Sequence, residues 1–210
     1  AGTEKLMRDV DYSARHSYEV LTIKAFRNEY ESAQIMISSE GEYAYDVTLS
    51  ALKNGNGDEL SADAFTLYHQ KYINVTKIKD NNPPTSVGYY PDALIPMDKA
   101  EAYGETKLTG KNQGVWVTLK APENQPAGDY TGEFTVTVGG KAYKVPVFVT
   151  VYDYTLSNET HSKSSFAIGE EYLGWGELDT SVKMQEAYYE ALLEYRLNGQ
   201  HLPGNEMVYV

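Results

Sequence analysis

Two adjacent carboxylates, Glu170 and Glu171, are the residues in this sequence whose type and spacing best suit acid–base chemistry. They follow a short apolar run at residues 165–168, which we expect to be a strand that opens into a loop. A pair of carboxylates can act as acid and base, or as acid and nucleophile, in glycoside hydrolysis. Adjacent side chains in one loop usually point apart, so a solvated acidic loop is the plainer alternative.

Two further residues in the same part of the chain could contact a substrate. Trp175 stands between Gly174 and Gly176, where its ring could stack on a sugar, although a packing anchor explains the pattern equally well. The candidate substrate-binding set is therefore Glu170, Glu171, Trp175 and His201.

Other chemical signatures are missing from the sequence. Its histidines, His16, His69, His161 and His201, lack the spacing of a metal site such as His-Glu-x-x-His. No serine has a Gly-x-Ser-x-Gly setting, the glycine-rich stretches do not follow a phosphate-loop pattern, and cysteine is absent. We therefore predict no metal site and no cofactor, and we assign no catalytic residue within this chain.

The composition disfavours several classes of partner. The chain has 210 residues, 41% of them hydrophobic, and a formal net charge of −12. This acidity argues against nucleic acids and anionic membranes, because both require a basic surface, and no apolar run reaches membrane-spanning length. The 19 tyrosines fit a half-solvated β surface, and contact with carbohydrate is the alternative explanation.

The elements that would position these residues begin with a long β region. Within residues 114–151, three runs alternate between apolar and polar residues, separated by a loop rich in Pro and Gly and by Gly139-Gly140. Such alternation is typical of half-buried antiparallel strands, and Gly-Gly suits a two-residue hairpin turn. We predict a three-stranded meander at the centre of a β-sandwich, with Trp116 or its immediate neighbours facing the core.

The preceding sequence supplies the second layer of the sandwich. Further strands are predicted at residues 4–12, 18–25, 33–38, 45–52 and 64–78. The first would be an edge strand, and the last is long enough to bend once and join both sheets. The chain is thus predicted to be mainly β, with an antiparallel β-sandwich of about eight strands over residues 1–155.

Residues 79–107 break the alternating pattern and are predicted to be irregular. A loop this long is usually functional or packed against a neighbour. Four of its residues are too apolar for a solvated linker: Tyr89, Tyr90, Leu94 and Ile95. We predict that they plug one end of the sandwich or a domain interface, with ligand binding as the alternative.

The sequence changes character over residues 156–210. After a polar linker and the apolar run 165–168, residues 179–181 offer an N-cap for a helix, and Gly199 stands where a C′ glycine belongs. Strand, helix and strand in this order open a parallel α/β unit, and one such unit cannot bury its helix. We therefore predict an incomplete α/β, barrel-like segment.

The predicted helix carries one apolar stripe, formed by Met184, Tyr188, Leu192 and Tyr195. Exposed stripes of this kind drive association. We expect the stripe to pack on another part of the chain or on a second copy, which would make the protein a homo-oligomer.

Three stretches, taken in order, carry a resemblance to a known family. They are Arg27-Asn-Glu-Tyr-Glu-Ser-Ala-Gln-Ile35, Gly88-Tyr-Tyr-Pro-Asp-Ala-Leu-Ile-Pro96 and Pro126-Ala-Gly-Asp-Tyr-Thr-Gly132. Together they resemble the N-terminal β-sandwich of bacterial secreted glycoside hydrolases of the β-N-acetylgalactosaminidase type, family 123. The resemblance covers roughly residues 20–205 and extends into what looks like the first helix of a (β/α)8 barrel. It implies a catalytic Asp-Glu pair on a later barrel strand, and no residue here matches that motif.

Three functions follow as hypotheses. The first is the non-catalytic N-terminal sandwich fragment of a secreted or cell-surface bacterial glycoside hydrolase that acts on amino-sugar-containing glycans. The second is a free-standing carbohydrate-binding or adhesion module. The third is a small enzyme that uses Glu170, Glu171 or His201. The incomplete α/β segment favours the first, because a binding module gains nothing from a lone helix.

Overall fold

The structure is a computed structural model that describes residues 4–13, 20–78, 86–105, 107–166 and 179–199. Its contacts divide the chain into two units, Ala1–Thr155 and Leu156–Val210, and each is described by itself. In the described ranges, no helix combines the length and the apolar character needed to cross a membrane.

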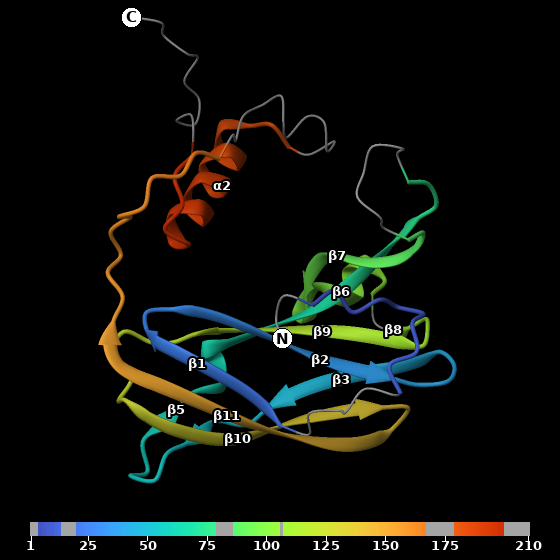
Figure 1. Ribbon diagram of the computed structural model, residues 1–210, viewed down its shortest axis with the longest axis horizontal. Helices are drawn as coiled ribbons and strands as arrows, with labels where there is room; N and C mark the ends of the chain where they lie inside the picture. The colour runs from blue at the N-terminus through green and yellow to red at the C-terminus, as the bar shows by residue number, and fades with distance from the viewer. Residues whose placement is uncertain (1–3, 14–19, 79–85, 106, 167–178, 200–210) are drawn as a thin grey trace, which may run out of the picture. The chain divides into compact units, whose positions relative to one another are not determined.

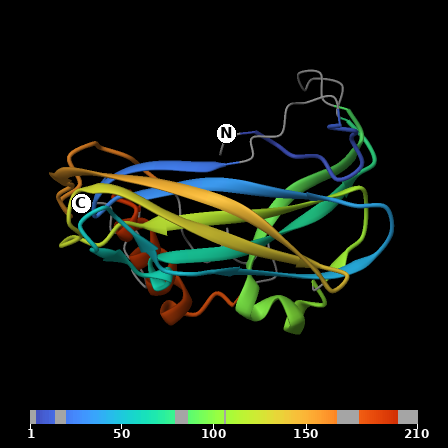
Figure 2. The ribbon, with the colours of Figure 1, turned by 90° about the horizontal axis from the view of Figure 1, so that it is seen from below.

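The first unit is a β-sandwich of two sheets, which Figures 1 and 2 show as stacked layers. One sheet has the order β1-β11-β10-β3-β8, with β4 attached to β10 and β5 to β4, and the other has the order β2-β9-β6-β7. The elements are β1 (Leu21–Arg27), β2 (Tyr30–Ser38), β3 (Tyr43–Leu49), β4 (Leu52–Lys53), β5 (Glu59–Leu60), the 3-10 helix η1 (Ala62–Ala64), β6 (Phe65–Val75), β7 (Gly88–Pro96), the 3-10 helix η2 (Met97–Tyr103), β8 (Lys107–Leu108), β9 (Asn112–Lys120), β10 (Gly128–Val138) and β11 (Lys141–Thr155). The mainly β sandwich architecture is therefore confirmed.

Alternation along each strand builds the core between the sheets. On β9, Val115, Val117 and Leu119 are fully buried, while Trp116 lies on the opposite face of the sheet, as the period of two requires. The facing sheet contributes Tyr130 and Phe134 of β10, also fully buried. Burying such side chains contributes about 1.5–3 kcal/mol each, so this interior stabilises the sandwich. The prediction that Trp116 or a neighbour faces the core is confirmed, through the two valines.

The predicted meander over residues 114–151 is wrong in its first strand. The β10–β11 hairpin forms as expected, with its Gly139-Gly140 turn at φ 56° and 81°. Strand β9, however, pairs with β2 and β6 in the opposite sheet. The Pro/Gly loop before β10 crosses between layers, and the alternating pattern is the same whichever sheet a strand joins.

The seven-stranded sheet is mixed, because β1 runs parallel to β11 from Leu21↔Val147 to Arg27↔Thr155. The long strand β6 does not join both sheets: it pairs with β9 and β7 in one sheet and shifts register between Gln70 and Tyr72. The register shift corresponds to the bend that was predicted from the length of the strand.

The predicted edge strand at residues 4–12 is not a strand. Its described part has a turn at Arg8 and Asp9 and makes isolated backbone hydrogen bonds. The amide of Arg8 donates to the carbonyl of Tyr89 at 3.3 Å, and the amide of Asn112 donates to the carbonyl of Arg8 at 2.8 Å.

The prediction of an irregular stretch at residues 79–107 is also wrong, since that stretch contains β7 and η2. Strand β7 lies at the edge of its sheet, and an edge position tolerates Pro91 within a strand. The four apolar residues that were assigned to a loop, Tyr89, Tyr90, Leu94 and Ile95, therefore belong to an edge strand.

The second unit contains the helix α2 (Val182–Glu194), labelled in Figure 1. Ser181 caps it as predicted, and its side chain accepts from the amide of Met184 at 3.3 Å. The helix ends earlier than predicted: Arg196, at φ 59°, takes the left-handed position assigned to Gly199. Gly199 instead forms a parallel bridge with Phe166.

None of the α2 residues is buried. Of the predicted stripe, Met184 and Leu192 are half-buried, and Tyr188 and Tyr195 are exposed. The parallel bridge, with α2 between its two residues, follows the order of a parallel α/β unit. The partner of the stripe, and the assignment of this unit to a barrel, stay predictions.

Candidate functional site

The candidate substrate-binding residues, Glu170, Glu171, Trp175 and His201, lie outside the described residues. Their roles stay predictions. The site developed below therefore rests on the sandwich alone.

The four apolar residues that were predicted to plug the sandwich or a domain interface lie on β7, and neighbouring side chains contact most of them. The guanidinium carbon of Arg8 lies 3.2 Å from the ring centroid of Tyr89, and the ammonium of Lys5 lies 5.9 Å from that of Tyr90. Ile95 is buried and Leu94 is 41% exposed. Within the sandwich, side chains of the N-terminal segment thus lie against the two tyrosines, and the Ile95 side chain is buried.

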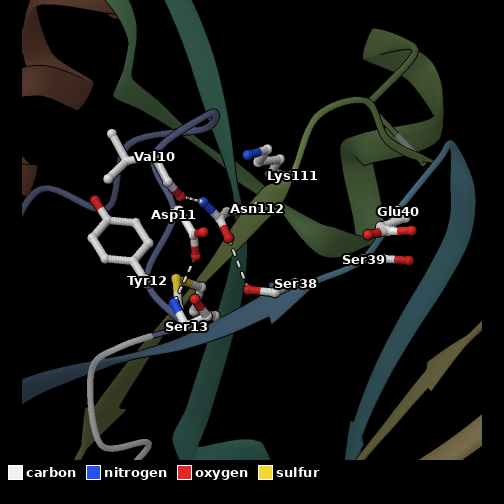
Figure 3. Close-up of a pocket in the computed structure, with 10 residues that line it drawn as sticks. Val10, Asp11, Tyr12, Ser13, Ser38, Ser39, Glu40, Lys111 and Asn112 are labelled. Atoms are coloured by element: carbon white, nitrogen blue, oxygen red, sulfur yellow. Dashed lines mark hydrogen bonds between the residues drawn. The ribbon is translucent and has the colours of Figure 1, made fainter.

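A pocket of about 810 Å³ lies beside that N-terminal segment (Figure 3). It is bounded by the N-terminal segment, by the end of β2 with the two residues that follow it, and by the start of β9 with the residue before it. The lining residues are Val10, Asp11, Tyr12, Ser13, Met36, Ser38, Ser39, Glu40, Lys111 and Asn112.

Asn112 fixes the geometry of the pocket. Its side-chain amide donates to the carbonyls of Met7 at 3.1 Å and Val10 at 2.7 Å, and its amide oxygen accepts from the Ser38 hydroxyl at 2.8 Å (Figure 3 draws the contacts to Val10 and Ser38). Asn112 is 2% exposed, so these bonds are shielded from water. One buried amide therefore holds the irregular N-terminal segment against the regular sheet.

Charged groups of both signs stand at the pocket. Asp11 accepts from the amide of Ser13 at 2.8 Å, and Glu40 and Lys111 are exposed. The hydroxyl and then the amide of Ser13, with a smaller effect of Lys111, hold the pKa of Asp11 below its ordinary value. Asp11 is therefore ionised near neutral pH and accepts hydrogen bonds, and it is unsuited to act as a general acid.

A second polar cluster spans the interior between the sheets. The Tyr45 hydroxyl lies 2.5 Å from His69 Nδ1, His69 Nε2 lies 3.1 Å from Glu105 Oε2, and Lys71 Nζ lies 2.9 Å from Glu105 Oε1. An ionised carboxylate only accepts, so Nε2 carries the proton and Nδ1 accepts from Tyr45. Tyr45 comes from one sheet and His69 from the other, so the cluster joins the two layers.

The centre of the cluster, Tyr45 and His69, is shielded from solvent, which favours a structural role. His69 is 2% exposed, and burial lowers its pKa, against the opposing effect of Glu105. Burial also raises the pKa of Tyr45 well above its ordinary value. In the sequence, His69 is notable only as a histidine without the spacing of a metal site. Its place on the inward face of β6, in step with Leu67, was the signal that it belongs to the interior.

No group of three or more His, Asp or Glu side chains able to hold a metal ion occurs within the ranges that the structure describes. The pocket offers hydroxyls, amides and isolated charges, which suit hydrogen bonding to a polar organic ligand.

Comparison with known families gives a match over most of the sandwich. The family model of the glycoside hydrolase 123 N-terminal domain matches residues 7–138. The chain belongs to this family. The matched range includes the pocket, the interior cluster and strands β1 to β10.

A solved structure agrees with this assignment at the level of the fold. A family 123 glycoside hydrolase from Clostridium perfringens, described in work on glycolipid glycan hydrolysis, superposes with a TM-score of 0.74 at 18% identity. The match covers 93% of this family 123 chain and 35% of the enzyme, so the chain spans about a third of the enzyme's length. The CooA pilin subunit from enterotoxigenic Escherichia coli gives a TM-score of only 0.32 at 11% identity, over 66% of this chain and 92% of the pilin. A comparison with curated protein sequences gives no match.

Proposed function

We propose that this chain is the non-catalytic N-terminal sandwich of a secreted bacterial glycoside hydrolase that acts on glycans containing amino sugars. The observation that carries the proposal is the family 123 match over residues 7–138. The resemblance of three sequence stretches to β-N-acetylgalactosaminidase-type enzymes supports the choice of amino sugars and of a secreted or cell-surface location.

The chemistry of the sandwich supports a non-catalytic role. Canonical glycoside hydrolysis requires one carboxylic acid that is protonated when the glycosidic bond breaks. The pKa of Asp11 is lowered rather than raised, and Glu105 is paired with His69 and Lys71. At the pocket, Asp11 is therefore unsuited to donate a proton, and in the interior cluster the Glu105 carboxylate is already engaged by its two partners.

Hydrolysis of an aryl β-N-acetylgalactosaminide tests this function directly. The 210-residue chain should give no turnover, whereas the longer gene product, where the reading frame continues, should release the aryl group. Turnover by the short chain that disappears in Glu170→Gln or Glu171→Gln would refute the non-catalytic role. Inactivity of the longer product on amino-sugar substrates, with activity on other glycosides, would refute the substrate class.

A free-standing carbohydrate-binding module is the second candidate, and the pocket beside β9 favours it. That pocket is held by hydrogen bonds of the buried Asn112 within the sandwich. A reading frame that stops close to Val210 would support this candidate over the first.

A further inference from the structure

The end of β2 and the start of β9 bring three polar side chains to one rim. Ser38 pairs with Asn112, and one step further the amide of Ser39 donates to the carbonyl of Lys111 at 3.0 Å. Glu40 follows directly, so a hydroxyl, a carboxylate and an ammonium line the same pocket, as Figure 3 shows. The pairing of the two strands places the backbones of these residues side by side.

These rim groups have hydrogen-bonding capacity to spare. In the described ranges, Ser39 Oγ, the Glu40 carboxylate and Lys111 Nζ make no hydrogen bond to another side chain, although Lys111 acts electrostatically on Asp11. Lys111 donates, Glu40 accepts, and the hydroxyl does both. A ligand that suits all three must itself present donors and acceptors close together.

The same pocket also has apolar surface. Met36 and Tyr12 are among the residues that line it. A sugar ring matches this combination, because its C–H faces pack on apolar side chains while its hydroxyls reach polar ones. An acetamido group adds one N–H donor, one carbonyl acceptor and a methyl group. Two carboxylates against one ammonium, and a net charge of −12, disfavour acidic sugars.

We propose that this pocket binds a neutral saccharide carrying an acetamido group, with Ser39, Glu40 and Lys111 as the hydrogen-bonding residues. The choice of an acetamido sugar rests on the proposed function, whereas the binding of a neutral saccharide rests on the pocket alone. Both claims concern binding and require no hydrolysis by this chain.

The test is a titration of the ¹⁵N-labelled 210-residue chain, followed by amide chemical shifts. The probes are N-acetylgalactosamine, galactose and N-acetylneuraminic acid. The expected result is saturable shifts of Ser39, Glu40, Lys111 and Asn112 with N-acetylgalactosamine, weaker binding of galactose and none of the acidic sugar. Saturable shifts elsewhere, preference for the acidic sugar, or no shifts with any probe would overturn the proposal. Equal binding of galactose would remove the acetamido claim alone.

Two variants and a matched control sharpen the result. Lys111→Ala and Glu40→Gln should each weaken N-acetylgalactosamine binding about tenfold, because each removes a charged hydrogen-bonding partner. Lys24→Ala removes the same charge from an exposed position on β1 and should leave the affinity unchanged. An unchanged affinity in both pocket variants, or an equal loss in the control, would refute the assignment. All three positions are exposed, so folding is preserved, and dispersion of the amide spectrum verifies this.

Failure of this proposal can be told apart from failure of the proposed function. Absence of sugar binding by the sandwich would leave the hydrolysis expected of the longer gene product unaffected. Loss of that hydrolysis would, in turn, leave the titration of the pocket unchanged.

Discussion

Gly114 is the position where a single methyl group should disturb the sandwich most clearly. It lies on β9 beside Met36 of β2, and a Cβ added there would stand 1.8 Å from Gln70 Oε1 and 2.6 Å from Gln70 Cδ. Gln70 is 3% exposed, and its side-chain amide donates to Gln34 Oε1 at 2.8 Å. The Gln70 side chain thus occupies the space that any other residue at position 114 would need.

We expect Gly114→Ala to destabilise the sandwich by about 2 kcal/mol. Overpacking of a tight interior costs about 1–3 kcal/mol, and displacing Gln70 loses a hydrogen bond worth about 1 kcal/mol. The gain in strand propensity from replacing glycine offsets only about 0.5–1 kcal/mol. Gln70 Oε1 has no hydrogen-bond partner among the described residues, so Gln70→Ala also removes an unsatisfied buried acceptor and should cost only about 1–2 kcal/mol.

A double-mutant cycle separates this steric account from a general loss of order. In the Gln70→Ala background, Gly114→Ala should be nearly neutral, giving a coupling of about 2 kcal/mol, which is large for two residues in contact. Urea unfolding followed by far-ultraviolet circular dichroism measures all four proteins. Gly55→Ala is the control, because a Cβ there meets nothing within 4 Å. Additive effects, or a Gly114→Ala cost no larger than that of the control, would refute the reasoning.

Three further predictions follow from the described residues. Burial lowers the pKa of His69, so the unfolded chain binds more protons than the folded chain below about pH 6.5, and stability should fall as the pH drops through that range. In His69→Gln, the urea midpoint should change less with pH between about pH 5.5 and 7. The control His161→Gln, at an exposed position, should keep the pH dependence of the unmodified chain. Leu192→Asp should either expose the second unit to proteolysis near His161 or convert a dimer into a monomer by light scattering, while Leu193→Asp, one residue off the stripe, should do neither. Ser181→Ala removes the hydrogen bond to the amide of Met184 and should destabilise α2 by about 1 kcal/mol, seen as faster amide exchange in its first turn.

The mistaken predictions share one physical origin. Alternation identified β9, β10 and β11 individually, but it could not say that β9 joins the sheet opposite the other two. A strand's period of two records only that one face is buried. The strand's neighbour is chosen by packing across the whole sandwich. The position of β7 in its sheet likewise depends on packing. Only its place at the edge shows that a strand containing proline can form there.

The candidate sites divide in the same way. The four substrate-binding candidates were chosen by chemical type, and they lie outside the described residues. The pocket could not be predicted in this way, because Asp11, Glu40 and Lys111 are ordinary charged residues in the sequence. Only the pairing of β2 with β9 and the hydrogen bonds of Asn112 bring them together.

Local sequence patterns are enough to predict the β architecture of this family 123 chain, most of its longer strands and the capped start of α2. These features depend on local preferences: the alternation of side chains, the φ angles open to glycine, and the capping hydroxyl of a serine. Only the tertiary structure shows the division of strands between two sheets, the pairing of His69 with Tyr45 and Glu105, and the pocket beside Asn112. These features depend on contacts between residues far apart in the chain, and the free energy of such contacts is set by the packing of the whole sandwich.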